Sequence, residues 1–195
     1  MNLANILTGS RIVMSPVFLI VYFIPVWTGR FGFESVVICW SLFILMELSD
    51  LFDGMAARAA NQVSDLGKVF DPFADVVSRL TYFLCFTVSG FMPVLVFAII
   101  MYRELGILFI RMLAVKKGFV MGARAGGKLK AWSYAFSGIS GLLYVSILRT
   151  GFFPEYAGSV LLAAKVFFLL SAVSALASLA DYLIMLKKKF YGSNS

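Results

Sequence analysis

Apolar residues dominate the chain in six long runs, which short polar or glycine-containing segments separate. Each run holds about 20 mostly apolar residues, the length that an α-helix needs to cross the hydrocarbon core of a bilayer. The pattern therefore predicts an all-α integral membrane protein with six transmembrane helices. The predicted spans are Ile12–Thr28, Phe33–Arg58, Asp71–Ser89, Pro93–Leu113, Ala131–Leu148 and Ser159–Leu186.

The first ten residues follow a different pattern. Asn2, Asn5 and Thr8 recur about one helical turn apart, with leucine and isoleucine between them. A short amphipathic helix that lies at the membrane interface has this arrangement. We therefore expect a single membrane domain over residues 1–195, in which residues 1–10 form an interfacial helix ahead of the first span.

The composition agrees with a membrane protein, because 61% of the 195 residues are hydrophobic and 14% are charged. A soluble domain is nearer to half apolar and a quarter charged. Histidine is absent, which excludes histidine-based catalytic triads and zinc sites. Cys39 and Cys85 both lie inside apolar runs, so no disulfide framework is expected.

The net charge of +7 is unevenly distributed along the chain. Most of the basic excess lies between Arg103 and Lys130 and in the C-terminal tail, beside the apolar runs. Cytoplasmic loops of membrane proteins carry this excess of Lys and Arg. An even number of spans then predicts that both termini lie on the cytoplasmic side of a cell (inner) membrane. The basic residues there would face anionic membrane lipids. No sequence signature of nucleic-acid binding accompanies the charge, so no nucleic acid is expected as a partner.

Four aspartates stand at the cytoplasmic ends of the second and third predicted helices. Asp50 and Asp53 are about 60° apart around one helix, and Asp71 and Asp75 are about 40° apart around the next. A short connection lets both pairs face one space, where four carboxylates would repel one another. Divalent cations would offset that repulsion, and oxygen ligands suit Mg²⁺ or Mn²⁺. The alternative is a solvated helix end with ordinary ion pairs.

Small residues between the aspartates leave space for a ligand. Gly54 follows Asp53, and Ala57 comes one turn later, so a flat group can approach the backbone closely. Arg58 can meet a phosphate group. Gly67 precedes Asp71 by four residues. These residues favour a nucleotide site, although small residues also occur where membrane helices pack.

The combined pattern resembles the signature of the CDP-alcohol phosphotransferase family, whose members are membrane enzymes of about six helices. The matching stretch is Asp50-x-x-Asp53-Gly54-x-x-Ala57-Arg58, then eight residues, then Gly67-x-x-x-Asp71-x-x-x-Asp75. The resemblance implies two divalent ions, Mg²⁺ or Mn²⁺, bound by the four aspartates, with Asp75 also the catalytic base on the acceptor hydroxyl. It implies a homodimer as well. It assigns the CDP site to Asp50, Gly54, Ala57, Arg58 and Gly67.

A second group of basic residues points to the acceptor. Arginine forks and lysine charges in such a group can bind a phosphate, although anchoring to lipid headgroups is the alternative reading. The segment from Tyr102 to Trp132 and the N-terminal stretch from Asn2 to Pro16 both resemble the branch of the family that uses glycerol 3-phosphate. Ala131 in the first stretch and Ala4 in the second depart from that branch. The candidate phosphate-binding residues are Arg103, Arg111, Arg124, Lys128 and Lys130.

These resemblances imply an enzyme that transfers the phosphatidyl group of CDP-diacylglycerol to glycerol 3-phosphate, giving phosphatidylglycerophosphate and CMP. Inositol phosphate, inositol, serine or choline is the alternative acceptor within the family. A small ion transporter is the alternative from another class, and it predicts acids spread along the membrane depth. Lys165 and Asp181 interrupt the last span, where we expect helix-packing or interfacial roles, with a pore as the alternative.

Overall fold

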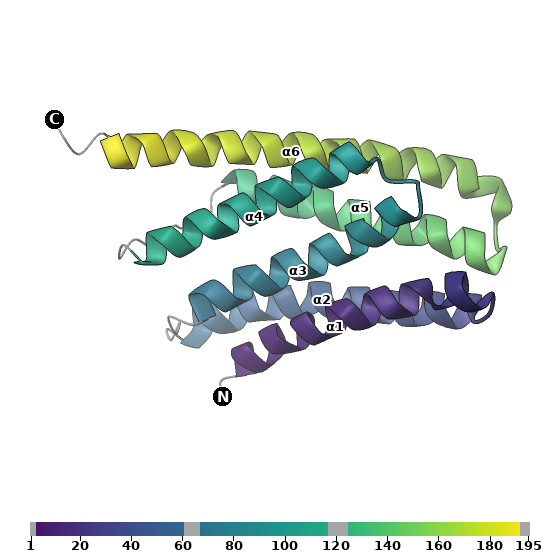
Figure 1. The fold of residues 1–195 in the computed structure, drawn as a ribbon. Coiled ribbons are helices and arrows are strands. Elements are labelled where there is room, and N and C mark those ends of the chain that lie inside the picture. Colours follow the sequence, from purple (N-terminus) through teal and green to yellow (C-terminus); the bar gives the residue numbers. More distant parts are fainter. Residues whose placement is uncertain (1–2, 61–66, 117–124, 192–195) are drawn as a thin grey trace.

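The computed structural model is a bundle of six long helices (Figure 1). The structure describes the backbone of residues 3–60, 67–116 and 125–191 and the side chains of residues 8–49, 70–114 and 130–185, and this part of the chain contains no strand. The elements are α1 (Leu3–Thr28), α2 (Gly32–Ala60), α3 (Gly67–Val88), α4 (Val94–Lys116), α5 (Ala125–Thr150), the 3-10 turn η1 (Pro154–Tyr156) and α6 (Ala157–Tyr191).

The first helix differs from its prediction. α1 is continuous from Leu3 to Thr28, so residues 3–10 are its first turns, and the structure does not confirm a separate interfacial helix. Gly9 and Ser10 lower helix propensity only modestly, and both keep the backbone N–H that a helix needs. Nothing at the predicted boundary therefore interrupts the helix.

Four of the six helices confirm the integral-membrane character. α3 and α4 are not among the segments that are long and apolar enough to cross a membrane. Charged residues interrupt both helices: Asp71, Asp75 and Arg79 in α3, and three residues between 103 and 111 in α4. The count of six spans is therefore not confirmed. Within the described residues, the qualifying segments are Thr8–Thr28, Gly32–Ser49, Lys130–Thr150 and Pro154–Met185.

The outer surface of the bundle is apolar along its longest helix. Large aliphatic side chains of α6 are exposed at several successive turns. Contiguous apolar surface of this kind is rare on soluble monomers, and a lipid environment accounts for it. These exposed residues are Leu162, Leu169, Val173, Leu176 and Ile184.

Aromatic side chains and two glycines form the contact of α5 with α2 and α3. A Cβ atom on Gly138 would lie 2.5 Å from Phe43 Cε2, and one on Gly141 would lie 2.4 Å from Phe86 Cε2. Phe43 also packs edge-on against Tyr82, with 5.4 Å between ring centroids. Glycine is needed at both positions because any side chain would overlap a buried ring.

Serine pairs connect α5 to α6. Ser137 and Ser171 share a hydrogen bond of 2.8 Å between their hydroxyl oxygens, and Ser133 and Ser174 share one of 3.0 Å. Small hydroxyl residues are common at helix contacts in membranes, where they allow close approach and satisfy one another. This face of α6 therefore packs against protein, while its aliphatic face stays exposed.

The helices alternate in direction, so the bundle has two distinct ends (Figure 1). One end contains the first turns of α3 and α5 and the last turns of α2 and α4. We call it the carboxylate end, because Asp71 and Asp75 lie in the first three turns of α3. The other is the glycine-turn end, where Gly29, Gly90 and Gly151 follow α1, α3 and α5 with positive φ angles of 66°, 82° and 70°. Glycine adopts this left-handed conformation readily, which ends each helix.

Candidate active site

Asp71 and Asp75 lie one helical turn apart on α3, as their spacing predicts. The Asp71 side chain is 45% exposed and the Asp75 side chain 25% exposed. An arginine pairs with each carboxylate. Arg11 NH2 donates to Asp71 Oδ1, and Arg79 NH1 donates to Asp75 Oδ2 at 2.7 Å. The two carboxylates therefore remain partly accessible while arginines offset their charge.

Arg11 and Arg79 are both buried, with 1% and 6% of their surface exposed. Arg11 belongs to α1, so its ion pair with Asp71 joins α1 to α3. The two paired residues are 60 positions apart in the sequence. A charged residue inside an apolar helix is costly unless it is paired. The position of both arginines inside apolar stretches of sequence therefore indicates that each has a partner, but only the structure identifies that partner.

Tyr134 of α5 lies between the carboxylates and the basic residues. Its side chain is fully buried. Arg79 Cζ lies 5.9 Å and Lys130 Nζ 5.0 Å from the centroid of its ring. Cations attract the negative face of an aromatic ring at such distances. Arg79 therefore contacts both Asp75 and Tyr134, and the Tyr134 ring links Arg79 to Lys130.

Arg103, Glu104 and Lys130 form a buried group that we call the α4–α5 charge cluster. Glu104 Oε1 accepts hydrogen bonds from Arg103 NH1 at 2.9 Å and from Lys130 Nζ at 2.8 Å. Arg103 NH2 donates to Ser178 Oγ of α6 at 2.6 Å. Two cations and one anion leave the cluster with a net positive charge. Buried charge of this kind is stable only when it is paired, so the cluster is suited to bind an anion.

Arg111 lies apart from this cluster in the structure. Its NH2 donates to the Tyr182 hydroxyl at 3.0 Å, and its Cζ lies 5.9 Å from the Tyr182 ring centroid. The Nε atoms of Arg103 and Arg111 are both buried and have no hydrogen-bond partner within the described residues. Each arginine therefore keeps one N–H donor that a bound anion could satisfy.

The remaining predicted site residues lie outside the described side chains. Asp50, Asp53, Gly54, Ala57 and Arg58 belong to the last turns of α2, whose backbone alone is described. Gly67 begins α3. Lys128 stands in the first turn of α5, and Arg124 lies outside the described residues. The structure thus places Asp71 and Asp75 one turn apart on α3 and joins Arg103 to Lys130 through Glu104, and it leaves the other predicted contacts untested.

The described donors fit a divalent cation. Asp71 and Asp75 present carboxylate oxygens, which Mg²⁺ and Mn²⁺ prefer, from one face of α3. No three metal-binding side chains converge among the described residues. The side chains of Asp50 and Asp53, the other two predicted ligands, lie outside the described residues. The half of the site that the structure describes therefore has suitable chemistry for a metal ion.

Glu104 and Tyr134 are site residues that the sequence analysis did not single out. Glu104 directly follows Arg103 in an apolar helix, which is a signal for a paired charge. Tyr134 had no signal, since a tyrosine in a membrane helix is ordinarily a packing or interfacial residue. Their contacts depend on how α3, α4 and α5 pack.

Comparison with known proteins shows the family to which the chain belongs. The family model described as CDP-alcohol phosphatidyltransferase matches residues 1–171. A Treponema pallidum (strain Nichols) protein named CDP-diacylglycerol--glycerol-3-phosphate 3-phosphatidyltransferase is 34% identical over 194 residues, which cover 94% of this chain and 88% of that protein. A Bacillus subtilis (strain 168) protein of the same name is 31% identical over 148 residues, covering 73% and 76%. A Mycobacterium tuberculosis (strain ATCC 25618 / H37Rv) protein named probable phosphatidylglycerophosphate synthase is 36% identical over 134 residues, covering 69% and 62%. The family prediction is confirmed: the chain belongs to the CDP-alcohol phosphatidyltransferase family.

Proposed function

We propose that the protein transfers the phosphatidyl group of CDP-diacylglycerol to glycerol 3-phosphate, giving phosphatidylglycerophosphate and CMP. Relatives that align with most of this chain carry names for that reaction. The observation that carries the choice of acceptor is the α4–α5 charge cluster. It is buried and positive, and Lys130 lies against the same Tyr134 ring as Arg79, the hydrogen-bond partner of Asp75. It therefore suits a phosphorylated acceptor better than a neutral or cationic one.

The acceptor hydroxyl oxygen attacks the phosphorus of the phosphatidyl group, and the bond from that phosphorus to the CMP oxygen breaks. Asp75 takes the hydroxyl proton as general base. The hydrogen bond from Arg79 NH1, at 2.7 Å, orients the Asp75 carboxylate. Two divalent ions, Mg²⁺ or Mn²⁺, bound by Asp50, Asp53, Asp71 and Asp75 would neutralise the diphosphate. Positioning and charge neutralisation are the main requirements of such a displacement.

The phosphate of the acceptor binds to the basic residues that face the site. Arg103 and Lys130 supply two buried cations, and the free Nε–H of Arg103 supplies a further donor. Arg111, Arg124 and Lys128 complete the phosphate site in this proposal. Glu104 positions Arg103 and Lys130 through its two hydrogen bonds.

The cytidine diphosphate of the donor binds beside the last turns of α2. Gly54 and Ala57 provide close access to the backbone, and Asp50, Arg58 and Gly67 line the same site. The acyl chains of the donor extend along the apolar outer surface. This assignment rests on the match of these residue types and spacings to the family signature.

We also propose how the enzyme lies in the membrane and in which oligomeric state it acts. All six helices span the membrane, because pairing of the charges in α3 and α4 lowers the cost of burying them. The carboxylate end faces the cytoplasmic side of an inner membrane, in agreement with the basic residues of segment 114–130. The protein acts as a homodimer, as the family resemblance implies.

An acceptor panel tests the reaction. Purified full-length protein is incubated with CDP-diacylglycerol, Mg²⁺ or Mn²⁺, and glycerol 3-phosphate, inositol phosphate, inositol, serine or choline, and CMP release and lipid product are measured. We expect CMP and phosphatidylglycerophosphate with glycerol 3-phosphate. CMP with inositol phosphate alone would overturn the acceptor, and no CMP with any acceptor would leave the transporter reading in its place.

A further inference from the structure

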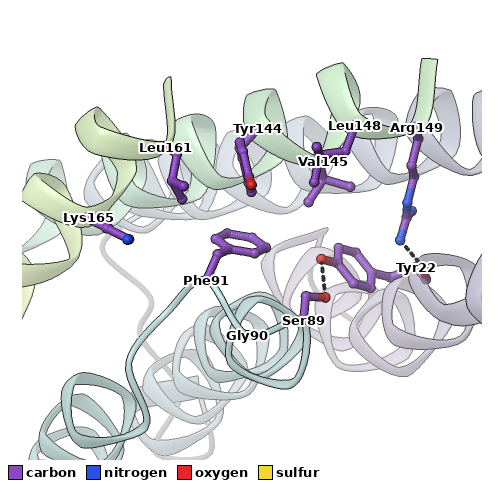
Figure 2. Close-up of a pocket in the computed structure, with 10 residues that line it drawn as sticks. All are labelled: Tyr22, Ser89, Gly90, Phe91, Tyr144, Val145, Leu148, Arg149, Leu161 and Lys165. Atoms are coloured by element: carbon purple, nitrogen blue, oxygen red, sulfur yellow. Dashed lines mark hydrogen bonds between the residues drawn. The ribbon is translucent and has the colours of Figure 1, made fainter. Parts of the chain in front are cut away.

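A cavity of about 430 Å³ lies at the glycine-turn end of the bundle, away from the aspartates (Figure 2). Side chains from α1, α5 and α6 and from the turn between α3 and α4 form its walls. None of the residues that line it belongs to the proposed active site. The lining residues are Tyr22, Ser89, Gly90, Phe91, Tyr144, Val145, Leu148, Arg149, Leu161 and Lys165.

The walls combine apolar surface with a few hydroxyl groups. Phe91 and Leu161 are apolar walls, and Tyr22 and Ser89 share a hydrogen bond of 2.9 Å between their hydroxyl oxygens. Figure 2 shows the Tyr144 hydroxyl directed into the cavity, and no hydrogen bond satisfies it within the described residues. Such a lining suits a ligand that has both an apolar and a polar part.

Two cations lie at opposite ends of the cavity, and no carboxylate pairs with either of them within the described residues (Figure 2). Arg149 is bound by neutral groups: its NH1 donates to Ser35 Oγ at 3.1 Å, and its NH2 donates to the Tyr22 carbonyl oxygen at 2.7 Å. Lys165 has no hydrogen-bond or ion-pair partner in this part of the chain. The cavity is therefore positively charged, and the Lys165 ammonium is its available donor.

The depth of Lys165 makes an unpaired ammonium costly. Lys165 stands eight residues after Ala157, where α6 begins, so its Cα lies about 12 Å along the helix from that end. A lysine this far from the helix end, in a span as apolar as α6, needs either a long reach to the interface or an anion nearby. The positive-inside trend also disfavours cations at the end away from the cytoplasm.

We propose that this cavity binds one anionic phospholipid from the leaflet opposite the carboxylate end. The lipid phosphate accepts hydrogen bonds from Lys165 Nζ and the Tyr144 hydroxyl, and the apolar part of the lipid packs on Phe91 and Leu161. Arg149 adds positive potential from the other end of the cavity. A free phosphate has the same anionic chemistry, but the apolar walls favour a phosphate that carries acyl chains. The inference rests on the proposed membrane orientation and does not depend on the acceptor of the reaction.

Lipid titration of the purified, delipidated full chain in neutral detergent tests this site. Bound lipid is counted by native mass spectrometry during titration with phosphatidic acid, with phosphatidylcholine, and with inorganic phosphate alone. We expect one phosphatidic acid to bind in preference to phosphatidylcholine. Lys165→Met should weaken that binding about tenfold, the loss of one charge-assisted hydrogen bond, and Lys165→Arg should retain it. The control is Arg30→Met, which removes a charge at the same end but outside the cavity and should leave binding unchanged.

The outcomes separate this site from the reaction. Equal loss in Lys165→Met and Arg30→Met would mean general surface charge and would overturn the proposal, as would equal binding of phosphatidic acid and phosphatidylcholine. Binding of inorganic phosphate with no preference for phosphatidic acid would overturn the lipid assignment and make the ligand of this cavity a free anion. CMP release by Lys165→Met, measured in parallel, should stay at the parent rate, so a failed lipid site and a failed enzyme assignment give different results.

Discussion

Replacing Glu104 with glutamine changes the charge of the α4–α5 charge cluster and leaves its shape almost unchanged. The carboxylate accepts bonds from both Arg103 and Lys130, at 2.9 Å and 2.8 Å. Loss of one partner from a buried ion pair costs about 3–5 kcal/mol. Both bonds end on Oε1, where glutamine also carries an oxygen, so the substitution removes the negative charge and can keep the bonds. We therefore expect the free energy of unfolding to fall by about 3 kcal/mol, the low end of that range. For a chain of this size that lowers the Tm by about 6–12 °C.

The same substitution should strengthen the binding of a phosphate. Glu104 repels an incoming anion, and its removal leaves Arg103 and Lys130 without their own counter-charge. A ligand that binds the folded state stabilises it according to its affinity. At one fixed concentration, glycerol 3-phosphate should therefore raise the Tm of Glu104→Gln by more than it raises the Tm of the parent chain.

Thermal unfolding of the purified proteins in detergent measures this difference, with glycerol at the same concentration as the uncharged ligand. Glu155→Gln is the matched control, since Glu155 is exposed in η1 at the other end of the bundle; its effect should stay within about 0.5 kcal/mol. If glycerol and glycerol 3-phosphate shift the Tm of Glu104→Gln equally, Arg103 and Lys130 do not bind the acceptor phosphate.

Four further outcomes test the site and the packing. Asp75→Asn should reduce CMP release by at least about 100-fold, the contribution of a general base, and it should also lower the Tm, because the buried Arg79 loses its paired charge. Arg111→Ala should mainly raise the KM for glycerol 3-phosphate, and an unchanged KM would remove Arg111 from the phosphate site. Removal of divalent ions with a chelator should stop CMP release, and added Mg²⁺ or Mn²⁺ should restore it. Gly141→Ala should lower the free energy of unfolding by about 1–3 kcal/mol, because its Cβ would lie 2.4 Å from Phe86 Cε2; Gly106→Ala, which meets no atom within 4 Å, should be neutral or stabilising.

The sequence predicted the location of the helices better than it predicted where the first helix begins. All six apolar runs lie in long helices, and the break after Thr28 occurs at Gly29, as the sequence indicates. The separate interfacial helix over residues 1–10 is not confirmed, because an amphipathic pattern describes the face of a helix and says nothing about where the helix ends. Continuous hydrogen bonding carried α1 through that boundary.

Within the site, one-dimensional spacing was informative wherever the relevant residues share a helix. Asp71 and Asp75 face the same way because four residues make about one turn. The partners of the charged residues were not predictable in this way. Arg11 reaches Asp71 on another helix, and Lys130 reaches Glu104 across 26 positions.

The sequence alone determined the membrane class, the helical elements and the family, because hydropathy, helical periodicity and the aspartate–glycine signature are all local properties of the chain. The tertiary structure decided which charges meet. It set Glu104 between Arg103 and Lys130, and it brought Arg149 to the carbonyl of Tyr22, 127 positions away. Such contacts depend on the rotation and separation of packed helices, which the ring contacts at Gly138 and Gly141 set in this bundle. For that reason the cavity beside Lys165 became visible only in the folded chain.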